Sequence, residues 1–308
     1  MLGRKVAPLQ LCASGRTSRS MTHAAAAQTA SSTADALVNP SLEAVVPPQP
    51  RDYHGFNWAG FTTLYLREVR RFWKVGTQTL AAPVVTALLY MLVFVVAVRG
   101  ASPPVHGTPF STFVAPGLIM MSILNNAFAN SSSSLLQAKF NGLIGDFLTP
   151  PLAPLEHVGA FTLGAATRGV LVGAVTWAAV LPFAHLPLAH PWAVLYFGLG
   201  ASFILAMLGI MAGLWAEKFD HMAAVTNFAI MPMTFLSGTF YLVDRLPEPF
   251  RSFSRFNPFF YLIDGFRYGF IGHAEGVLWV GVLMTAGLVA AFAFTCLWMF
   301  ETGYKLKT

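Results

Sequence analysis

The chain has 308 residues, of which 55% are hydrophobic and only 10% are charged. Soluble domains usually carry roughly a quarter charged residues, so this composition excludes an ordinary water-soluble domain and predicts a membrane protein. The net charge of +6 first informs orientation, because Lys and Arg gather on the cytoplasmic side of membrane proteins. We therefore expect membrane lipids, and no nucleic acid, as partners.

The first fifty residues are rich in Ala, Ser, Thr and Pro, and they predict a disordered N-terminal extension over residues 1–55. Several basic residues precede the first acidic one, Asp35, as in an organelle-targeting segment. The alternatives are a dispensable extension or a true start at Met21. Targeting segments form amphipathic helices, and this stretch has only a weak amphipathic pattern, so the alternatives are favoured.

Residues 57–74 have the pattern of an amphipathic helix. Apolar residues recur in it at helical spacing, namely Phe61, Leu64, Tyr65, Val69 and Phe72. Basic residues cluster toward its end, at Arg67, Arg70, Arg71 and Lys74. We expect such a helix to lie in the membrane interface, with its aromatic residues at the acyl boundary and its bases toward lipid headgroups.

Six apolar stretches follow, each close to the roughly 20 residues that a spanning helix needs. They cover residues 75–98, 112–135, 158–183, 191–215, 222–242 and 277–300. The predicted fold class is therefore an all-α polytopic membrane protein with six transmembrane helices. Lys and Arg gather before the first span, after the second and fourth spans, and in the tail, which predicts that both termini are cytoplasmic.

Motifs for chemistry are absent from the sequence. There is no phosphate-binding loop of the G-x-x-x-x-G-K-[ST] type, so the chain has no such motif of its own for ATP. No set of His, Cys and carboxylate residues has metal-site spacing, and no hydrolase motif occurs. The sequence therefore predicts no enzyme activity, no metal site and no cofactor in this chain.

Polar side chains gather at the end of the second predicted span, at Asn125, Asn126, Asn130 and the serines of 131–134. At membrane depth such groups face other helices or a water-filled cavity. One interpretation is the lining of a substrate path. The alternative is interhelical hydrogen bonding, or a helix that is already leaving the bilayer, and the sequence does not choose between them.

The loop over residues 136–157 continues the second span and then offers a short helical stretch that ends at Pro150. In that stretch the apolar residues Ile144, Phe147 and Leu148 flank Asp146. Apolar residues exposed on the cytoplasmic face need a partner surface. They indicate either a docking element for another protein or a segment that folds back on the membrane.

Charged residues also occur in the third span and in the last long loop. We interpret Arg168 as snorkelling to the cytoplasmic interface from a span that starts late. The loop over residues 243–276 contains prolines and an aromatic stretch too short to span, which suits an interfacial or re-entrant cap on the outer side. In it, Asp264 and Arg267 lie three residues apart and are expected to pair on one helical face.

A combination of short motifs extends from about residue 55 to the end of the chain. It comprises the run VAPGLIMM at residues 114–121 with Asn125, Asn126 and Asn130, then Ala138-Lys139-Phe140, the run FLSGTFY at residues 235–241, Leu246-Pro247, Asn257-Pro258, Tyr261 and the run GFRYGF at residues 265–270. In this combination the chain resembles the permease subunits of type-2 ABC exporters, especially the YadH group of bacterial permeases.

The resemblance implies that residues 56–308 form one type-2 ABC transmembrane domain of a bacterial inner membrane. It implies a second permease copy, as a homodimer, and two copies of a cognate ABC ATP-binding subunit that carry the ATP and Mg. A coupling helix at residues 141–151 would contact that subunit through Phe140, Ile144, Asp146, Phe147 and Leu148. Relatives usually carry a Glu in this helix, so the acidic contact rests here on Asp146 alone. Two short re-entrant helices would form the outer cap, with Asn257, Tyr261, Asp264 and Arg267.

The function implied is that of a permease subunit in an ATP-driven exporter, which moves an amphiphile of the drug, lipid or glycan class out of the cytoplasm. The candidate path is lined by Asn125, Asn126 and Asn130. The alternative is an ATP-independent channel or secondary transporter, which should carry ionisable groups at the bilayer centre. A membrane enzyme is a third class, and the lack of a clustered His or carboxylate set weighs against it.

Overall fold

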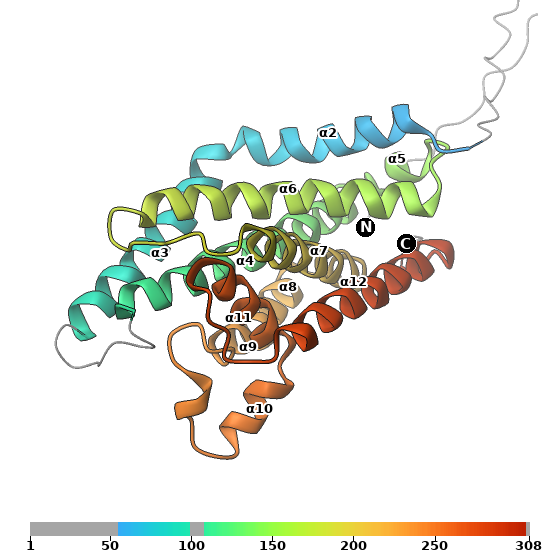
Figure 1. Cartoon of the computed structure of the whole chain (residues 1–308). Helices are drawn as coiled ribbons and strands as arrows, with labels where there is room; N and C mark the ends of the chain where they lie inside the picture. The colour runs from blue at the N-terminus through green and yellow to red at the C-terminus, as the bar shows by residue number, and fades with distance from the viewer. Residues whose placement is uncertain (1–54, 99–107, 306–308) are drawn as a thin grey trace, which may run out of the picture. The chain divides into compact units, whose positions relative to one another are not determined.

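The computed structural model describes residues 55–98 and 108–305, and the predicted N-terminal extension lies outside them. Every regular element of the described residues is a helix, as the sequence predicts (Figure 1). The helices are α2 (Trp58–Lys74), α3 (Gly76–Val98), α4 (Phe110–Phe140), α5 (Ile144–Leu148), α6 (Pro154–Val180), α7 (Pro191–Trp215), α8 (Phe219–Val225), the π-helix η1 (Thr226–Ile230), α9 (Met231–Phe235), the 3-10 helix η2 (Val243–Arg245), α10 (Phe250–Phe256), α11 (Pro258–Ile271) and α12 (Leu278–Glu301).

Five of these helices are long and apolar enough to cross a membrane, namely α3, α4, α6, α7 and α12. They correspond to predicted spans one, two, three, four and six, and α7 has the predicted bounds. The helix α4 continues to Phe140, past the predicted end of the second span, as expected for a span that leads into a docking loop.

The fifth predicted span differs from the expectation. Residues 222–242 are not one helix, because the helical run of α8, η1 and α9 ends at Phe235. A turn follows, in which Gly238 adopts a left-handed φ of +72° that favours glycine. A Cβ there would also lie 2.9 Å from Cγ2 of Val243. Hydropathy does not detect such a turn, and the prediction of a helix to residue 242 is therefore wrong. A sixth spanning helix is not found among the described residues.

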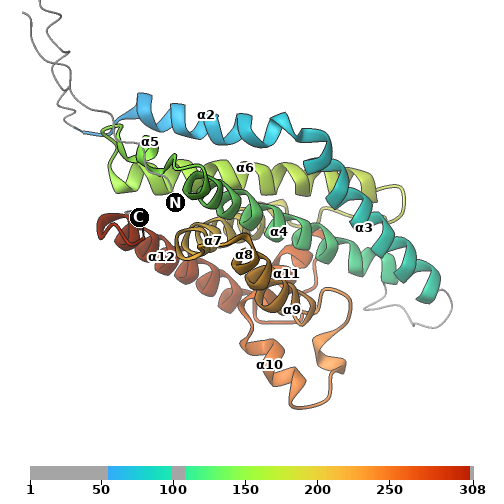
Figure 2. The same cartoon turned by 180° about the vertical axis from the view of Figure 1, so that it is seen from behind.

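The core is built around α4, which is buried along most of its length by α6, α7, α3 and α11. Close approach of α7 depends on a small residue at Gly209, where a Cβ would lie 2.6 Å from the carbonyl oxygen of Phe128. Small residues of this kind let the backbones of membrane helices approach each other. The amphipathic helix α2 runs alongside α6 in both views (Figure 1, Figure 2).

Between α9 and α12 lie three short elements, η2, α10 and α11. Helix α11 is buried against α7 and α4, whereas α10 exposes its aromatic residues. Asn257 caps the N-terminus of α11, because its Oδ1 accepts a hydrogen bond from the backbone N–H of Phe259 at 3.0 Å. The predicted short helices of the cap are therefore present, and their depth in a membrane stays a prediction.

Candidate transport cavity and docking element

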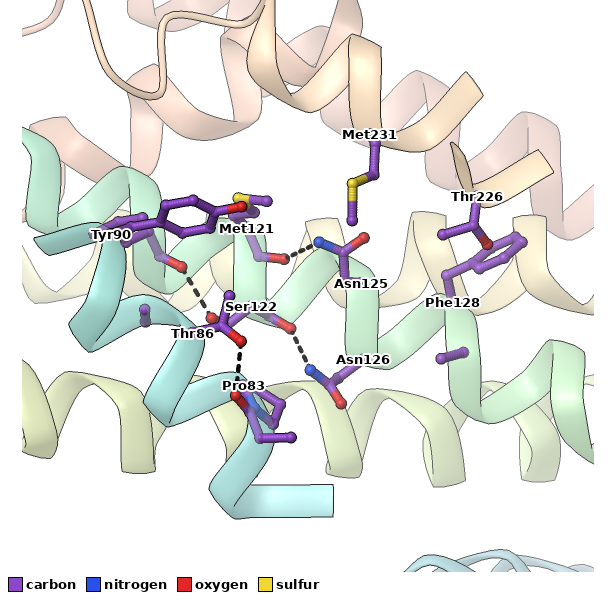
Figure 3. Close-up of a pocket in the computed structure, with 14 residues that line it drawn as sticks. Pro83, Thr86, Tyr90, Met121, Ser122, Asn125, Asn126, Phe128, Thr226 and Met231 are labelled. Carbon is purple, nitrogen blue, oxygen red and sulfur yellow. Dashed lines mark hydrogen bonds between the residues drawn. The ribbon is translucent and has the colours of Figure 1, made fainter. Parts of the chain in front are cut away.

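A cavity of about 330 Å³ lies between α3, α4 and the α8–α9 segment. Its wall is mostly apolar, with a polar strip formed by Thr86, Ser122, Asn125 and Asn126 (Figure 3). The amide nitrogens of Asn125 and Asn126 each donate to a carbonyl of the preceding turn of α4, at 3.0 Å. The Oδ1 of Asn125 is buried and has no hydrogen-bond partner among the described residues. The cavity therefore combines an apolar surface with a strip of four polar side chains.

Asn130, the third candidate for the path, lies outside this cavity. Its side chain is fully buried, and both its Oδ1 and its backbone oxygen accept from Nη2 of Arg71, at 3.0 and 2.6 Å. The structure thus places two of the three candidate residues at the cavity. It assigns Asn130 to interhelical hydrogen bonding, which is the alternative that the sequence left open.

Arg71 belongs to a buried network that fastens α2 to α4. Glu68, only 1% exposed, accepts from Arg71 at 3.3 Å and from the hydroxyl of Ser134 at 2.7 Å. On α6, the guanidinium of Arg168 donates to Oδ1 of Asn126 at 3.1 Å. We call these five residues, namely Glu68, Arg71, Asn130, Ser134 and Arg168, the α2 cluster. Sequence reasoning missed Glu68, although its spacing of three from Arg71 signals a pair.

These contacts correct two expectations. The four bases of α2 do not all face headgroups, because Arg71 is held by α4. Arg67, Arg70 and Lys74 are exposed, and Arg67 also lies 4.0 Å above the ring of Phe147. Arg168 also contacts α4 from the interior of α6, so its side chain is a helix–helix contact rather than a free snorkelling group.

The predicted docking element is formed by the end of α4 and by α5. Phe140 is 53% exposed and stacks on Phe219, with ring centroids 4.8 Å apart, while Asp146 is exposed and Ile144 is half-buried. Phe147, in contrast, is buried against Phe161 of α6. The expectation that Phe147 is presented to a partner is therefore corrected: it anchors α5 to the chain. The side chain of Leu148 lies outside the described residues.

The cap is held by a second buried charged group, which we call the cap cluster: Asp264, Arg267 and Glu275. Arg267 pairs with Glu275 at 3.0 Å and donates to the backbone oxygen of Gly238 at 2.6 Å. Asp264 accepts from the backbone N–H groups of Glu275 and Gly276, at 2.9 and 2.8 Å. The expected pair of Asp264 and Arg267 is thus replaced by a pair of Arg267 and Glu275.

Burial dominates the electrostatics of the cap cluster. It raises the pKa of Glu275 to about 7, against the opposing effect of Arg267, and it also raises the pKa of Asp264. Asn257 fastens the cap to the preceding segment, since its Nδ2 donates to the backbone oxygen of Met233 at 2.7 Å and to Oγ of Ser237 at 2.8 Å. Tyr261 packs edge-on against Phe260. These contacts are structural.

No group of three or more His, Cys, Asp or Glu residues within residues 55–98 and 108–305 could hold a metal ion. The geometry is that of a helical bundle with a cavity and a short helix, α5, whose Asp146 is exposed.

Comparison with protein families gives one match over most of this bundle: the profile described as ABC-2 type transporter matches residues 59–271. The chain belongs to the ABC-2 type transporter family. It is 33% identical over 254 residues to the inner membrane transport permease YadH of Escherichia coli strain K12, a match that covers 82% of this chain and 98% of that protein. It is also 29% identical over 192 residues to nodulation protein J of Rhizobium leguminosarum bv. viciae, covering 58% of this chain and 70% of that protein.

Membership confirms the resemblance drawn from the sequence. The chain is a multi-pass membrane protein and a transmembrane subunit of an ABC transporter. The family also implies an ATP-binding partner.

Proposed function

We propose that this chain is the conduit of an ATP-driven exporter that moves an amphiphilic molecule of the drug, lipid or glycan class out of the cytoplasm. The observation that carries the proposal is the continuity of α4. The same unbroken helix lines the cavity through Asn125 and Asn126 and ends at Phe140, shortly before α5 with its exposed Asp146. A displacement of α5 can therefore be transmitted to the cavity through α4.

The energy source in this proposal is a separate ATP-binding subunit, present in two copies, which holds the ATP and Mg. A second copy of the permease completes the path, and both termini face the cytoplasm. Closure of the ATP-binding subunits pushes on α5, and the two copies of α4 convert that movement into opening toward the outside. Such a ligand-driven shift between two states requires that ATP stabilise one of them more than the other.

The amphiphilic character of the cargo follows from the cavity. Its wall offers apolar surface from α3 and α4 together with the carboxamides of Asn125 and Asn126. An apolar tail would contact the apolar surface of α3 and α4, and a polar head would contact the two carboxamides. Such a wall suits neither a small ion nor a fully polar solute.

The docking role of α5 is tested by co-purification of this chain with its ATP-binding subunit. We expect Phe140→Ala combined with Asp146→Arg to abolish co-purification, because both side chains are exposed and their loss leaves the fold intact. The matched control is Asp220→Arg, which reverses an exposed charge on the nearby α8 and should leave co-purification unchanged. Unchanged co-purification of the double variant would refute the docking assignment.

A further inference from the structure

An unpaired positive charge, that of Arg168 on α6, contacts Asn126 of the cavity wall. Both oxygens of Glu68 are occupied, Oε2 by Arg71 and Oε1 by Ser134. Within the described part of the chain, Arg168 forms no ion pair, and the charged neighbour that acts on it is Arg71, which repels it. The α2 cluster therefore holds two guanidinium charges against one carboxylate.

Arg168 also has hydrogen-bonding capacity that the chain does not use. A guanidinium carries five N–H donors in a rigid fork. One nitrogen, Nη2, donates to Asn126, while Nε is buried and finds no partner among the described residues. A buried donor without a partner and a charge without a counter-ion are both destabilising. A phosphate group would satisfy both, because two of its oxygens match the guanidinium fork.

The position of Arg168 relates its need for an anionic partner to the cavity. Asn126 lines the cavity and accepts from Arg168, and one turn later on α4 Asn130 accepts from Arg71. The two guanidinium groups thus reach successive turns of the helix that forms the cavity wall. An amphiphile with its tail among the apolar residues of the cavity would bring its headgroup to Asn126 and Arg168.

We propose that Arg168, supported by Arg71, binds the phosphate-type anionic headgroup of the transported amphiphile. That this amphiphile is transported rests on the proposed function. The anion site itself rests only on the contacts of Arg168 and Arg71. The same chemistry is offered by a resident phospholipid of the bilayer, so the experiment has to separate these two sources.

The site is tested by the binding of dioleoylphosphatidic acid to the detergent-solubilised full chain, with dioleoylphosphatidylcholine and inorganic phosphate as reference ligands. We expect the wild type to prefer phosphatidic acid, and R168Q to weaken that binding about tenfold or more, the equivalent of one charge-assisted hydrogen bond. Binding of phosphatidylcholine should not change. The control R245Q removes an exposed base of η2, outside both the α2 helix and the cavity wall, and should bind phosphatidic acid as the wild type does.

A second variant separates loss of the site from loss of the fold. Asn126→Asp places a carboxylate within about hydrogen-bonding distance of Arg168, where it acts as an internal counter-ion. We expect N126D to raise the unfolding temperature and yet to weaken the binding of phosphatidic acid about tenfold. If R168Q and N126D both bind phosphatidic acid as tightly as the wild type, the proposal is overturned.

The source of the anion is decided in the complex with the ATP-binding subunit. If the headgroup belongs to the cargo, phosphatidic acid stimulates ATP hydrolysis by the wild-type complex and fails to stimulate the R168Q complex. Binding that depends on Arg168 without any stimulation in an active complex would assign the anion to a resident phospholipid and overturn the cargo assignment. If no active complex forms, the proposed function fails while the binding result on the isolated chain still decides the site.

Discussion

The α2 cluster and the cap cluster both hold helices together through buried charged side chains, but they have opposite charge balances. Each buries ionisable side chains that fasten a shorter helix to the spanning helices. The cap cluster holds one guanidinium and two carboxylates, whereas the α2 cluster holds two guanidinium groups and one carboxylate. The difference lies in how the excess charge is compensated.

In the cap cluster the excess is compensated within the chain. The carboxylate of Asp264 accepts two backbone N–H groups, that of Glu275 accepts the N–H of Val243, and Arg267 lies 3.9 Å above the ring of Phe113. In both clusters one arginine, Arg267 or Arg168, has an Nε without a partner among the described residues. The difference is the counter-ion, because Arg267 pairs with Glu275 at 3.0 Å, whereas Arg168 forms no ion pair within the described part of the chain. We infer that the cap cluster is a closed structural clasp and that the α2 cluster is open to a ligand.

The largest loss in the free energy of unfolding should follow from removing the Arg267–Glu275 pair of the cap cluster. Arg267→Gln leaves Glu275 buried without its partner, and we expect it to lower the free energy of unfolding by about 3–5 kcal/mol. Arg255→Gln is the control, because Arg255 and Asp244 form a pair at 3.0 Å that is more than half exposed, and its loss should cost less than about 1 kcal/mol. Equal losses in chemical unfolding of the two variants would contradict the clasp.

The second effect is a dependence on pH. Because the folded state raises the pKa of Glu275 to about 7, it binds this proton more tightly than the unfolded chain does, so the stabilising contribution is complete at low pH and is lost as pH rises through about 7. We expect the free energy of unfolding to fall by up to about 3 kcal/mol between about pH 5 and about pH 8.

Glu275→Gln should flatten this slope. A residual slope of the same sign should remain, because burial raises the pKa of Asp264 as well. Unfolding curves of the wild type and of E275Q, measured across this pH range, decide the point. A wild-type stability that rises with pH would show that the sign is wrong.

The smallest of the three effects concerns the α2 cluster. Glu68→Gln removes the only carboxylate partner that the described residues give Arg71, and we expect a loss of about 2 kcal/mol in the free energy of unfolding. Because it leaves two uncompensated guanidinium groups, it should also strengthen the binding of phosphatidic acid. Glu301→Gln, at an exposed position in the last turn of α12, is the control for both measurements. Weaker binding of phosphatidic acid in E68Q would contradict an open anion site.

Hydropathy and spacing were sufficient for the elements whose burial is regular. The bounds of α7, the run of α2 and the extension of α4 to Phe140 all follow from apolar length and periodicity. The end of the helix at Phe235 does not, because residues 236–242 are apolar enough to continue a span and the turn depends on the backbone of Gly238 and its contact with Val243.

The candidate site was predictable by residue type but not by partner. The sequence singled out the polar end of α4, yet Asn125, Asn126 and Asn130 have different roles. Asn130 lies one turn beyond Asn126 on the same face of the helix, and at that level Arg71 of α2 contacts it in place of the cavity. Likewise the spacing of Asp264 and Arg267 suggested a pair, and only the fold brings Glu275, eight residues further on, to Arg267. Long-range contacts of this kind have no local signal.

The central claim, that this chain is the conduit and a partner supplies the energy, is tested most directly by ATP hydrolysis in vesicles. The chain and its ATP-binding subunit are reconstituted together and separately. We predict hydrolysis by the complex, none by this chain alone, and a large reduction when Phe140→Ala and Asp146→Arg remove the docking surface. An ATP-binding subunit that hydrolyses ATP equally with and without the chain, while the chain alone moves solutes across the vesicle membrane, would contradict the account and favour a channel or secondary transporter.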